Sequence, residues 1–163
     1  MKVLGIDGSL RGTGLAVIEQ QGSRTVSRHW EVVKMSAKAP HSECLSTIRK
    51  RLDVVLAEHS PAAAVIEGGF FFKNAKVAMV LGEVRGVAIA GCATAGVPVF
   101  EYSPRRAKQN ITGWGAAPKE QVARMVKSVL GLSEIPPPDA ADALALALCH
   151  LQTNRCLLPS EPI

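Results

Sequence analysis

The sequence predicts an α/β domain in which a mixed five-stranded sheet carries helices on its faces. Three strand-like segments separated by short turns come first, and strands then alternate with helical patterns. This order predicts an antiparallel meander followed by parallel strands. A chain of 163 residues with 47% hydrophobic residues is also long enough to bury one core without disulfides.

The first three strands are expected at 2–7, 13–20 and 25–35. Residues 2–7, KVLGID, are mostly apolar, and glycines that include Gly8 and Gly12 mark a tight reversal before TGLAVIEQ. The third segment is rich in β-branched residues and alternates partially between apolar and polar residues. These features together predict a hairpin that is extended by a third strand.

Helices and two short strands are expected to alternate over the middle of the chain. Apolar residues recur at helical spacing over 42–58, with Ser42 as the candidate N-cap, and over 74–95, which Asn74 opens. The remaining strands are expected at 62–68, AAAVIEG, and 97–102, VPVFEY. The glycine-punctuated segment 74–95 fits a dimer interface or a plain core helix.

Three helices are expected in the last third of the chain. Ser103 and Pro104 form a cap and first-turn pair that begins a short basic helix. A second helix starts at Pro118 and ends at Gly131. The Ala- and Leu-rich stretch 136–150 forms the last helix, whose composition is typical of a buried element.

We expect a single domain over residues 1–155 and a flexible tail over 156–163, where Pro159 and Pro162 interrupt regular structure. The chain starts directly with a strand-like segment that lacks the features of a secretory signal. Glycines and a proline break its longest apolar run. We therefore expect a cytoplasmic protein without a membrane-spanning segment.

Positive charge gathers in one region of the chain. The net charge is +5 with a pI near 9.2, and one acidic residue, Glu120, accompanies the bases between residues 103 and 127. These bases are Arg105, Arg106, Lys108, Lys119, Arg124 and Lys127. The pattern fits either a solvated helix face or a nucleic-acid footprint. The four cysteines form no C-x-x-C pair, which argues against structural zinc.

The last helix begins with two aspartates, Asp139 and Asp142, spaced three residues apart. An aspartate in the first turn of a helix commonly accepts bonds from free N–H groups and meets the positive end of the dipole. One cap explains one aspartate, however, and residues three apart lie on the same face, where like charges repel. Capping and a metal site both remain open on this stretch alone.

Two further acids favour the metal site. Asp7 ends the first strand and Glu67 ends the fourth. Since the carboxyl ends of neighbouring strands meet in one crevice, and the last helix must dock on the sheet, we expect both acids to meet Asp139 and Asp142 there. Four carboxylates suit Mg²⁺ or Mn²⁺, and the lack of neighbouring Cys or His argues against zinc. Two such ions about 4 Å apart support phosphodiester hydrolysis.

The alternative is that Asp7 and Glu67 are simply acids at strand-end turns. Sugar kinases and actin-like ATPases also begin with an apolar strand, an aspartate and a glycine-rich reversal. Those proteins need two such domains around a nucleotide, whereas this chain has room for one.

Four segments together carry a family resemblance: LGIDGSLRGTGLAVIE, VIEGGFFFKNAKVAMVLGEVRGVAI, VPVFEYSPRRAKQNITGWGAAPKEQVARMV and PPDAADALALALCH. They resemble the RuvC family, the Holliday junction resolvases of bacteria, over nearly the whole chain. The resemblance implies a ribonuclease H-like fold and a homodimer. It further implies an Mg²⁺-dependent endodeoxyribonuclease that nicks two opposed strands of a four-way DNA junction in recombination and repair, and RuvA and RuvB as partners.

The resemblance also implies roles for individual residues. The family's four catalytic metal ligands fall on Asp7, Glu67, Asp139 and Asp142. With two Mg²⁺ ions per site, which Mn²⁺ can replace, Asp7 is expected to bridge both ions, Glu67 and Asp139 to complete one side each, and Asp142 to hold an ion or orient the attacking water. The implied DNA-binding residues are Phe70, Lys73, Arg105, Lys108 and Lys119.

The chain departs from the family pattern at two places. Gly8 and Ser9 follow the first aspartate where the family commonly has Pro-Gly, and Gly68 replaces a frequent Gln after the glutamate. Neither change removes a ligand. Two alternatives to junction resolution therefore stay open: a catalytically weak junction-binding protein, and a ribonuclease H-like nuclease for another branched substrate.

Overall fold

The computed structural model describes residues 1–68, 74–153 and 161–163. Its strands form one sheet in the spatial order β3-β2-β1-β4-β5. The strands are β1 (Lys2–Asp7), β2 (Gly12–Gln21), β3 (Arg24–Lys34), β4 (Ala63–Glu67) and β5 (Val99–Tyr102). The first three pair antiparallel, whereas β4 runs parallel to β1 and β5 runs parallel to β4. The predicted mixed five-stranded sheet is confirmed.

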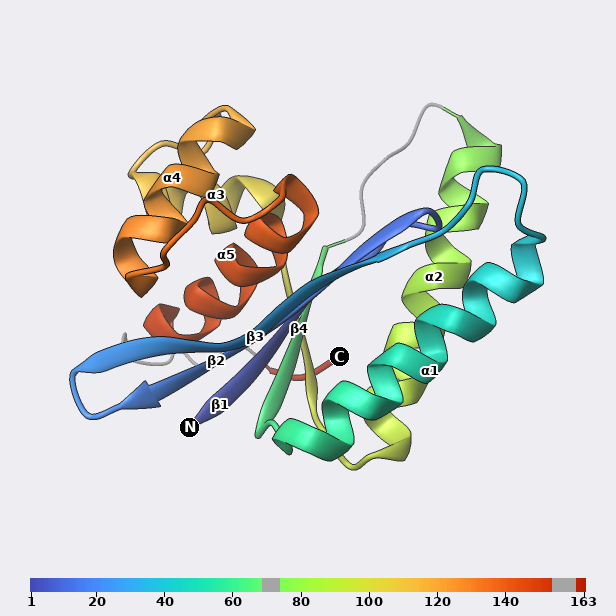
Figure 1. The fold of residues 1–163 in the computed structure, drawn as a ribbon, viewed down its shortest axis with the longest axis horizontal. Helices are drawn as coiled ribbons and strands as arrows, with labels where there is room; N and C mark the ends of the chain where they lie inside the picture. Colours follow the sequence, from blue (N-terminus) through green and yellow to red (C-terminus); the bar gives the residue numbers. More distant parts are fainter. Residues whose placement is uncertain (69–73, 154–160) are drawn as a thin grey trace.

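Helices cover both faces of this sheet. They are α1 (His41–His59), α2 (Ala75–Thr94), α3 (Pro104–Thr112), α4 (Lys119–Leu130) and α5 (Pro138–Thr153). Helices α1 and α2 lie on one face, and the three later helices lie on the other (Figure 1). Two hydrophobic clusters, one on each face, stabilise the layers.

Helix α5 lies unusually close to the sheet. A Cβ atom added to Gly5 would lie 1.9 Å from the carbonyl oxygen of Ala143, and one added to Gly14 would lie 2.1 Å from that of Asp139. Any side chain at these two strand positions would therefore overlap the helix backbone. The alanines of α5 serve the same end, because small side chains let a helix approach a sheet closely.

Local signals predict most element ends correctly. The Asn74 side chain accepts hydrogen bonds at the start of α2, Ser103 accepts one from the N–H of Arg106, and Gly131 ends α4 with a left-handed φ of 63°. The expected N-cap at Ser42 is wrong, because α1 begins at His41, after Pro40. Pro40 already has an extended backbone, and no side chain caps this end.

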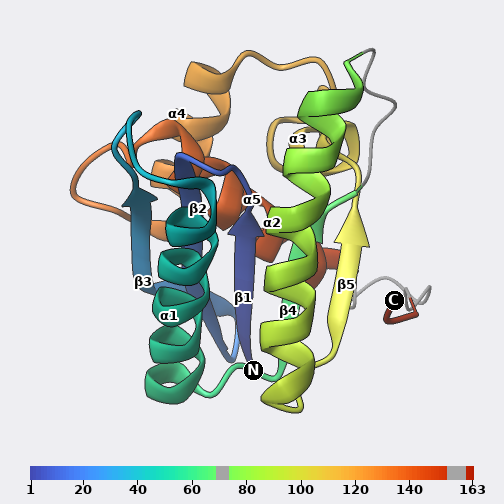
Figure 2. The same ribbon diagram turned by 90° about the vertical axis from the view of Figure 1, so that its right-hand side faces the viewer.

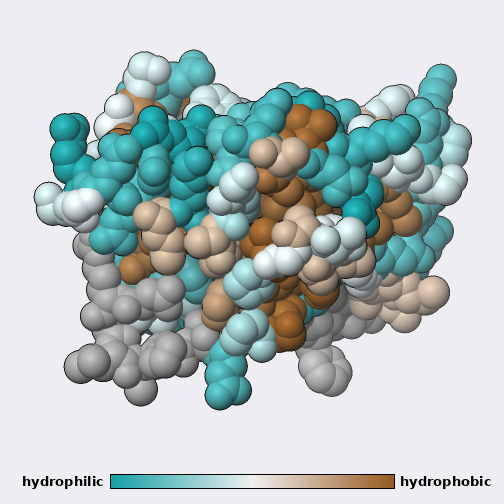
Figure 3. Space-filling model, turned by 90° about the horizontal axis from the view of Figure 1, so that it is seen from below, coloured by the Kyte–Doolittle hydropathy of each residue, from teal (hydrophilic) through white to brown (hydrophobic). Residues whose placement is uncertain are grey.

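The strands of the sheet run between two opposite ends of the molecule. Strands β1 and β5 point to the same end, where α3 lies (Figure 2). The surface seen from below, at the other end, is hydrophilic over much of its area, with hydrophobic side chains gathered near its middle (Figure 3). The predicted domain boundary after residue 155 stays a prediction, because 154–160 lie outside the described residues.

The close approach of α5 predicts a strong effect of Gly5→Ala. The added methyl group must push α5 away from β1, which should lower the free energy of unfolding by about 1–3 kcal/mol or more. Urea unfolding measures the difference. Ser46→Ala is the control, since Ser46 is exposed on α1 and alanine favours a helix. Equal stability of the two variants would contradict the packing argument.

Candidate active site

Strand alternation brings Asp7 and Glu67 to the same place. The parallel register pairs Ile6 with Ile66, so the acid that follows each isoleucine lies at the carboxyl end of its strand. Side chains alternate between the faces of a sheet, and Ile6 and Ile66 pack in the cluster that contains residues of α1 and α2. Asp7 and Glu67 therefore face the opposite side, toward α5.

The N-terminal part of α5 adds Asp139, in its first turn, and Asp142, one turn later, to this place. Gly14 on β2 pairs with Asp7, and the backbone of Asp139 lies directly against Gly14. A Cβ atom added to Gly12 would lie 3.0 Å from Oδ2 of Asp139, so the carboxylate occupies space beside the β1–β2 reversal. The glycines thus admit the helix that carries the acids.

Three of the acids line one cavity of about 130 Å³ together with two lysines. The acids are Asp7, Glu67 and Asp142, and the lysines are Lys108 from α3 and Lys119 from α4. Nζ of Lys119 lies 2.9 Å from Oδ2 of Asp142. The cavity therefore joins an acidic floor, provided by the sheet and α5, to bases from the two short helices.

The electrostatics show that the acids repel one another. Burial, followed by the charges of Asp142 and Glu67, raises the pKa of Asp7 to about 7, against the partial relief that Lys119 gives. Burial and the charge of Asp142 likewise raise the pKa of Glu67. The hydrogen bond with Asp142 raises the pKa of Lys119, because it favours the ammonium form.

The donor set suits a hard divalent cation. Carboxylate oxygens are the ligands that Mg²⁺ and Mn²⁺ prefer, and a cation would relieve the repulsion that raises the pKa of Asp7. As the side chains lie, no three His, Cys, Asp or Glu residues of the described chain gather closely enough to hold one ion. The Lys119 ammonium instead balances part of the charge on Asp142. The carboxylates are chemically suitable metal ligands, but their side chains would have to rotate to bind one ion together.

The predicted DNA-binding residues divide into two groups. Lys108 and Lys119 line the cavity, and Arg105 is exposed on α3, where its side chain lies against Gly115. Phe70 and Lys73 lie outside the described residues. The basic helices α3 and α4 thus place lysines beside the acids. This placement favours a nucleic-acid-binding surface over a basic helix face that is merely exposed to solvent.

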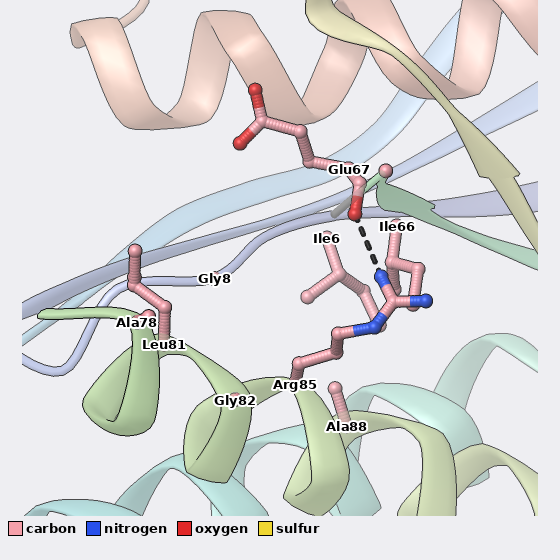
Figure 4. Close-up of a pocket in the computed structure, with 10 residues that line it drawn as sticks. Ile6, Gly8, Ile66, Glu67, Ala78, Leu81, Gly82, Arg85 and Ala88 are labelled. Atoms are coloured by element: carbon pink, nitrogen blue, oxygen red, sulfur yellow. Dashed lines mark hydrogen bonds between the residues drawn. The ribbon is translucent and has the colours of Figure 1, made fainter. Parts of the chain in front are cut away.

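Arg85 also contacts the site, although its residue type and spacing did not predict this. Its Nη1 donates a hydrogen bond of 2.8 Å to the main-chain oxygen of Glu67 (Figure 4). Its Nη2 lies 2.5 Å from Oε2 of Glu101. Its position in the largely apolar helix α2 was the available signal, since a charge beside an apolar face needs a partner.

Known proteins resemble this chain closely. The family described as crossover junction endodeoxyribonuclease RuvC matches residues 3–150. Proteins of that description from Trichlorobacter lovleyi and Myxococcus xanthus are 42% and 43% identical, over 99% and 98% of this chain and 91% and 85% of theirs. The structure of T. thermophilus RuvC in complex with Holliday junction substrate superposes with a TM-score of 0.91 at 38% identity, and covers 100% of this chain and 99% of that one.

The raised pKa of Asp7 predicts an unusual dependence of stability on pH. Without divalent cations, the unfolded chain loses the Asp7 proton near its ordinary pKa of 3.8, whereas the folded chain keeps it to about 7. The free energy of unfolding should therefore fall across this range, by up to about 4 kcal/mol from this group. Asp7→Asn should remove the part of the fall that Asp7 contributes and be the more stable protein at pH 8.

Urea unfolding between pH 4 and pH 8 measures this difference. Asp53→Asn, at an acid on α1 whose side chain is 48% exposed, serves as the control and should follow the parent protein. If Asp7→Asn and the parent lose stability in parallel as the pH rises, Asp7 is not in a repulsive, buried site.

Proposed function

The chain belongs to the RuvC family of crossover junction endodeoxyribonucleases, and from this we propose that it resolves four-way DNA junctions by paired nicks. The observation that carries the proposal is the cavity in which Asp7, Glu67 and Asp142 face Lys108 and Lys119. Acids that can hold cations and bases that can hold phosphates lie side by side there. Metal ions can catalyse phosphodiester hydrolysis, and basic side chains help to hold the phosphate.

The proposed cofactor is Mg²⁺, two ions per site, with Mn²⁺ as a substitute. The acids Asp7, Glu67, Asp139 and Asp142 would hold them, because the carboxyl ends of β1 and β4 lie beside the N-terminal part of α5. When bound, the ions supply an activated water and stabilise the departing oxygen. The acids contribute fixed ligand positions and a partly buried site in which charges interact strongly.

Lys108 and Lys119 are proposed to position the DNA backbone. Both lysines line the cavity, and their charges offset part of the rise in the pKa of Glu67 that burial and Asp142 cause. A scissile phosphate that enters the cavity would bring negative charge beside these ammonium groups. Lys119 can exchange its contact with Asp142 for a phosphate once a metal balances the acids.

Helix α2 is proposed as the dimer interface. The helix is strongly apolar, yet most of it is not buried, and Met79 and Val77 are 68% and 44% exposed. By length and composition alone this helix could also span a membrane. Packing against α1 and the charges of Lys76 and Glu83 favour a protein partner. A second copy would present two sites that match the two-fold symmetry of a junction.

The remaining parts of the proposal follow from family membership. We place the protein in the cytoplasm, with RuvA and RuvB as partners. One of Phe70, Phe71 and Phe72, with Phe70 as the family match, is proposed to act at the junction point, and Lys73 and Arg105 are proposed to contact the DNA beside Lys108 and Lys119. An incubation with a four-way junction, a Y-fork and a linear duplex separates this proposal from its alternatives. Paired symmetric nicks in the four-way junction alone support resolution. Cleavage of another branched substrate, or binding without cleavage, would replace it.

Asp7→Asn is expected to reduce junction cleavage by more than a thousandfold and to leave junction affinity within about threefold of the parent, since it removes a metal ligand and leaves the bases intact. Single-turnover cleavage in Mg²⁺ and a gel-shift titration measure the two quantities. Asp53→Asn should cleave like the parent. Parental cleavage by Asp7→Asn would end the metal assignment.

Lys108→Ala should weaken binding to junctions of any sequence and reduce the salt slope of log K by about one unit, because one fewer counterion is released. Lys50→Ala makes the same charge change on the exposed side of α1, on the opposite face of the sheet. It should leave the slope unchanged. Equal slopes for the parent and Lys108→Ala would remove Lys108 from the DNA contact.

A further inference from the structure

Arg85 connects three elements at the carboxyl end of the sheet. It lies on α2, donates to the main-chain oxygen of Glu67 at the end of β4, and pairs with Glu101 on β5. Its side chain is 29% exposed and that of Glu101 is 32% exposed, so the pair is mostly shielded from water. A guanidinium can make both contacts at once because its donors form a rigid fork.

Two hydrogen bonds hold the peptide group between Glu67 and Gly68, one at its oxygen and one at its N–H. Its oxygen accepts from Arg85 at 2.8 Å, and its N–H, on Gly68, donates to the oxygen of Tyr102 at 2.8 Å. A peptide group held at both its oxygen and its N–H has little freedom to rotate. The direction in which Glu67 projects its side chain follows from that orientation.

The carboxylate of Glu67 points away from Arg85 and from α2, on the far side of its own backbone (Figure 4). Arg85 therefore does not neutralise the acid that lines the cavity. It holds the main chain from behind, and the carboxylate stays available to the cavity that it shares with Asp7 and Asp142.

A cavity of about 180 Å³ adjoins this contact, with Ile6, Ile66, Leu81 and Ala88 among its mostly apolar lining. Arg85 also lines this cavity, and from there it makes the hydrogen bond to the end of β4. The Gly68 position adds to this, since a Cβ atom there would lie 2.9 Å from Oε1 of Glu101. The absence of a side chain at residue 68 lets Glu101 lie where Arg85 can reach it.

We propose that Arg85, held by Glu101, is a positioning residue that aims Glu67 into the acidic cavity. The proposal rests on the proposed function, in which Glu67 is a metal ligand. Groups that orient ligands typically change metal affinity or activity by 10- to 100-fold. Arg85 acts through the backbone of Glu67 and touches neither the substrate nor the reacting atoms.

Arg85→Ala, Arg85→Lys and Glu101→Gln test this role. Arg85→Ala should lower the single-turnover cleavage rate about 10- to 100-fold and leave junction affinity within about threefold of the parent. Arg85→Lys should recover part of the rate, because an ammonium can reach one of the two partners. Glu101→Gln, which keeps an acceptor for Arg85, should fall between the parent and Arg85→Ala. Methylguanidinium added to Arg85→Ala should restore part of its rate.

Arg51→Ala is the matched control. Arg51 makes a two-pronged pair with Glu31, with side chains 41% and 23% exposed, at 2.9 and 3.0 Å and away from the cavity. The Arg51→Ala variant should lose about as much folding stability as Arg85→Ala and keep the parental cleavage rate. The role fails if Arg85→Ala cleaves at the parental rate, or if its loss equals that of Arg51→Ala at equal fraction folded.

Mn²⁺ affinity, measured by calorimetry without DNA, separates this proposal from the proposed function. Arg85→Ala should bind Mn²⁺ about 10-fold more weakly than the parent and Arg51→Ala. If the parent cuts no junction but this difference holds, the proposed function fails and the positioning role stands. If the parent cuts junctions and the affinities are equal, the positioning role alone fails.

Discussion

The close contact between α5 and the first two strands is the constraint on which the candidate site depends. Hydrogen is the only substituent that Gly5 and Gly14 can carry beneath this helix, because its carbonyl oxygens occupy the space of a side chain. The contact places the first turn of α5 beside the end of β1. Acids separated by more than a hundred residues in the chain become neighbours, and small residues at the contact make this possible.

The same contact has an electrostatic cost. Buried carboxylates that face one another keep protons that free carboxylates release, as the pKa of about 7 for Asp7 shows. Lys119 offsets part of this charge through Asp142. The hydrophobic clusters on both faces of the sheet hold the acids in place despite their repulsion. The fold thus stabilises an arrangement that a bound cation would favour, and function and stability oppose each other at one position.

Local signals made most of the fold predictable. The antiparallel meander and the later parallel strands followed from the order of the apolar segments, and the ends of α2, α3 and α4 followed from Asn74, Ser103 and Gly131. The proximity of the acids could be predicted from the sequence because β1 and β4 end at the same edge of the sheet. The contact of Lys119 with Asp142 and the hydrogen bond of Arg85 to Glu67 could not be predicted, since both depend on how separate elements pack. The predicted start of α1 was wrong because the helix begins directly after Pro40, without a side-chain cap.

Anomalous diffraction from a crystal soaked in Mn²⁺ tests the central claim most directly, since it locates the ion without reference to activity. The account predicts a peak within coordinating distance of the carboxylate of Asp7 and of at least one other acid among Glu67, Asp139 and Asp142. A peak elsewhere on the molecule, with none at Asp7 under conditions in which Mn²⁺ supports cleavage, would contradict it.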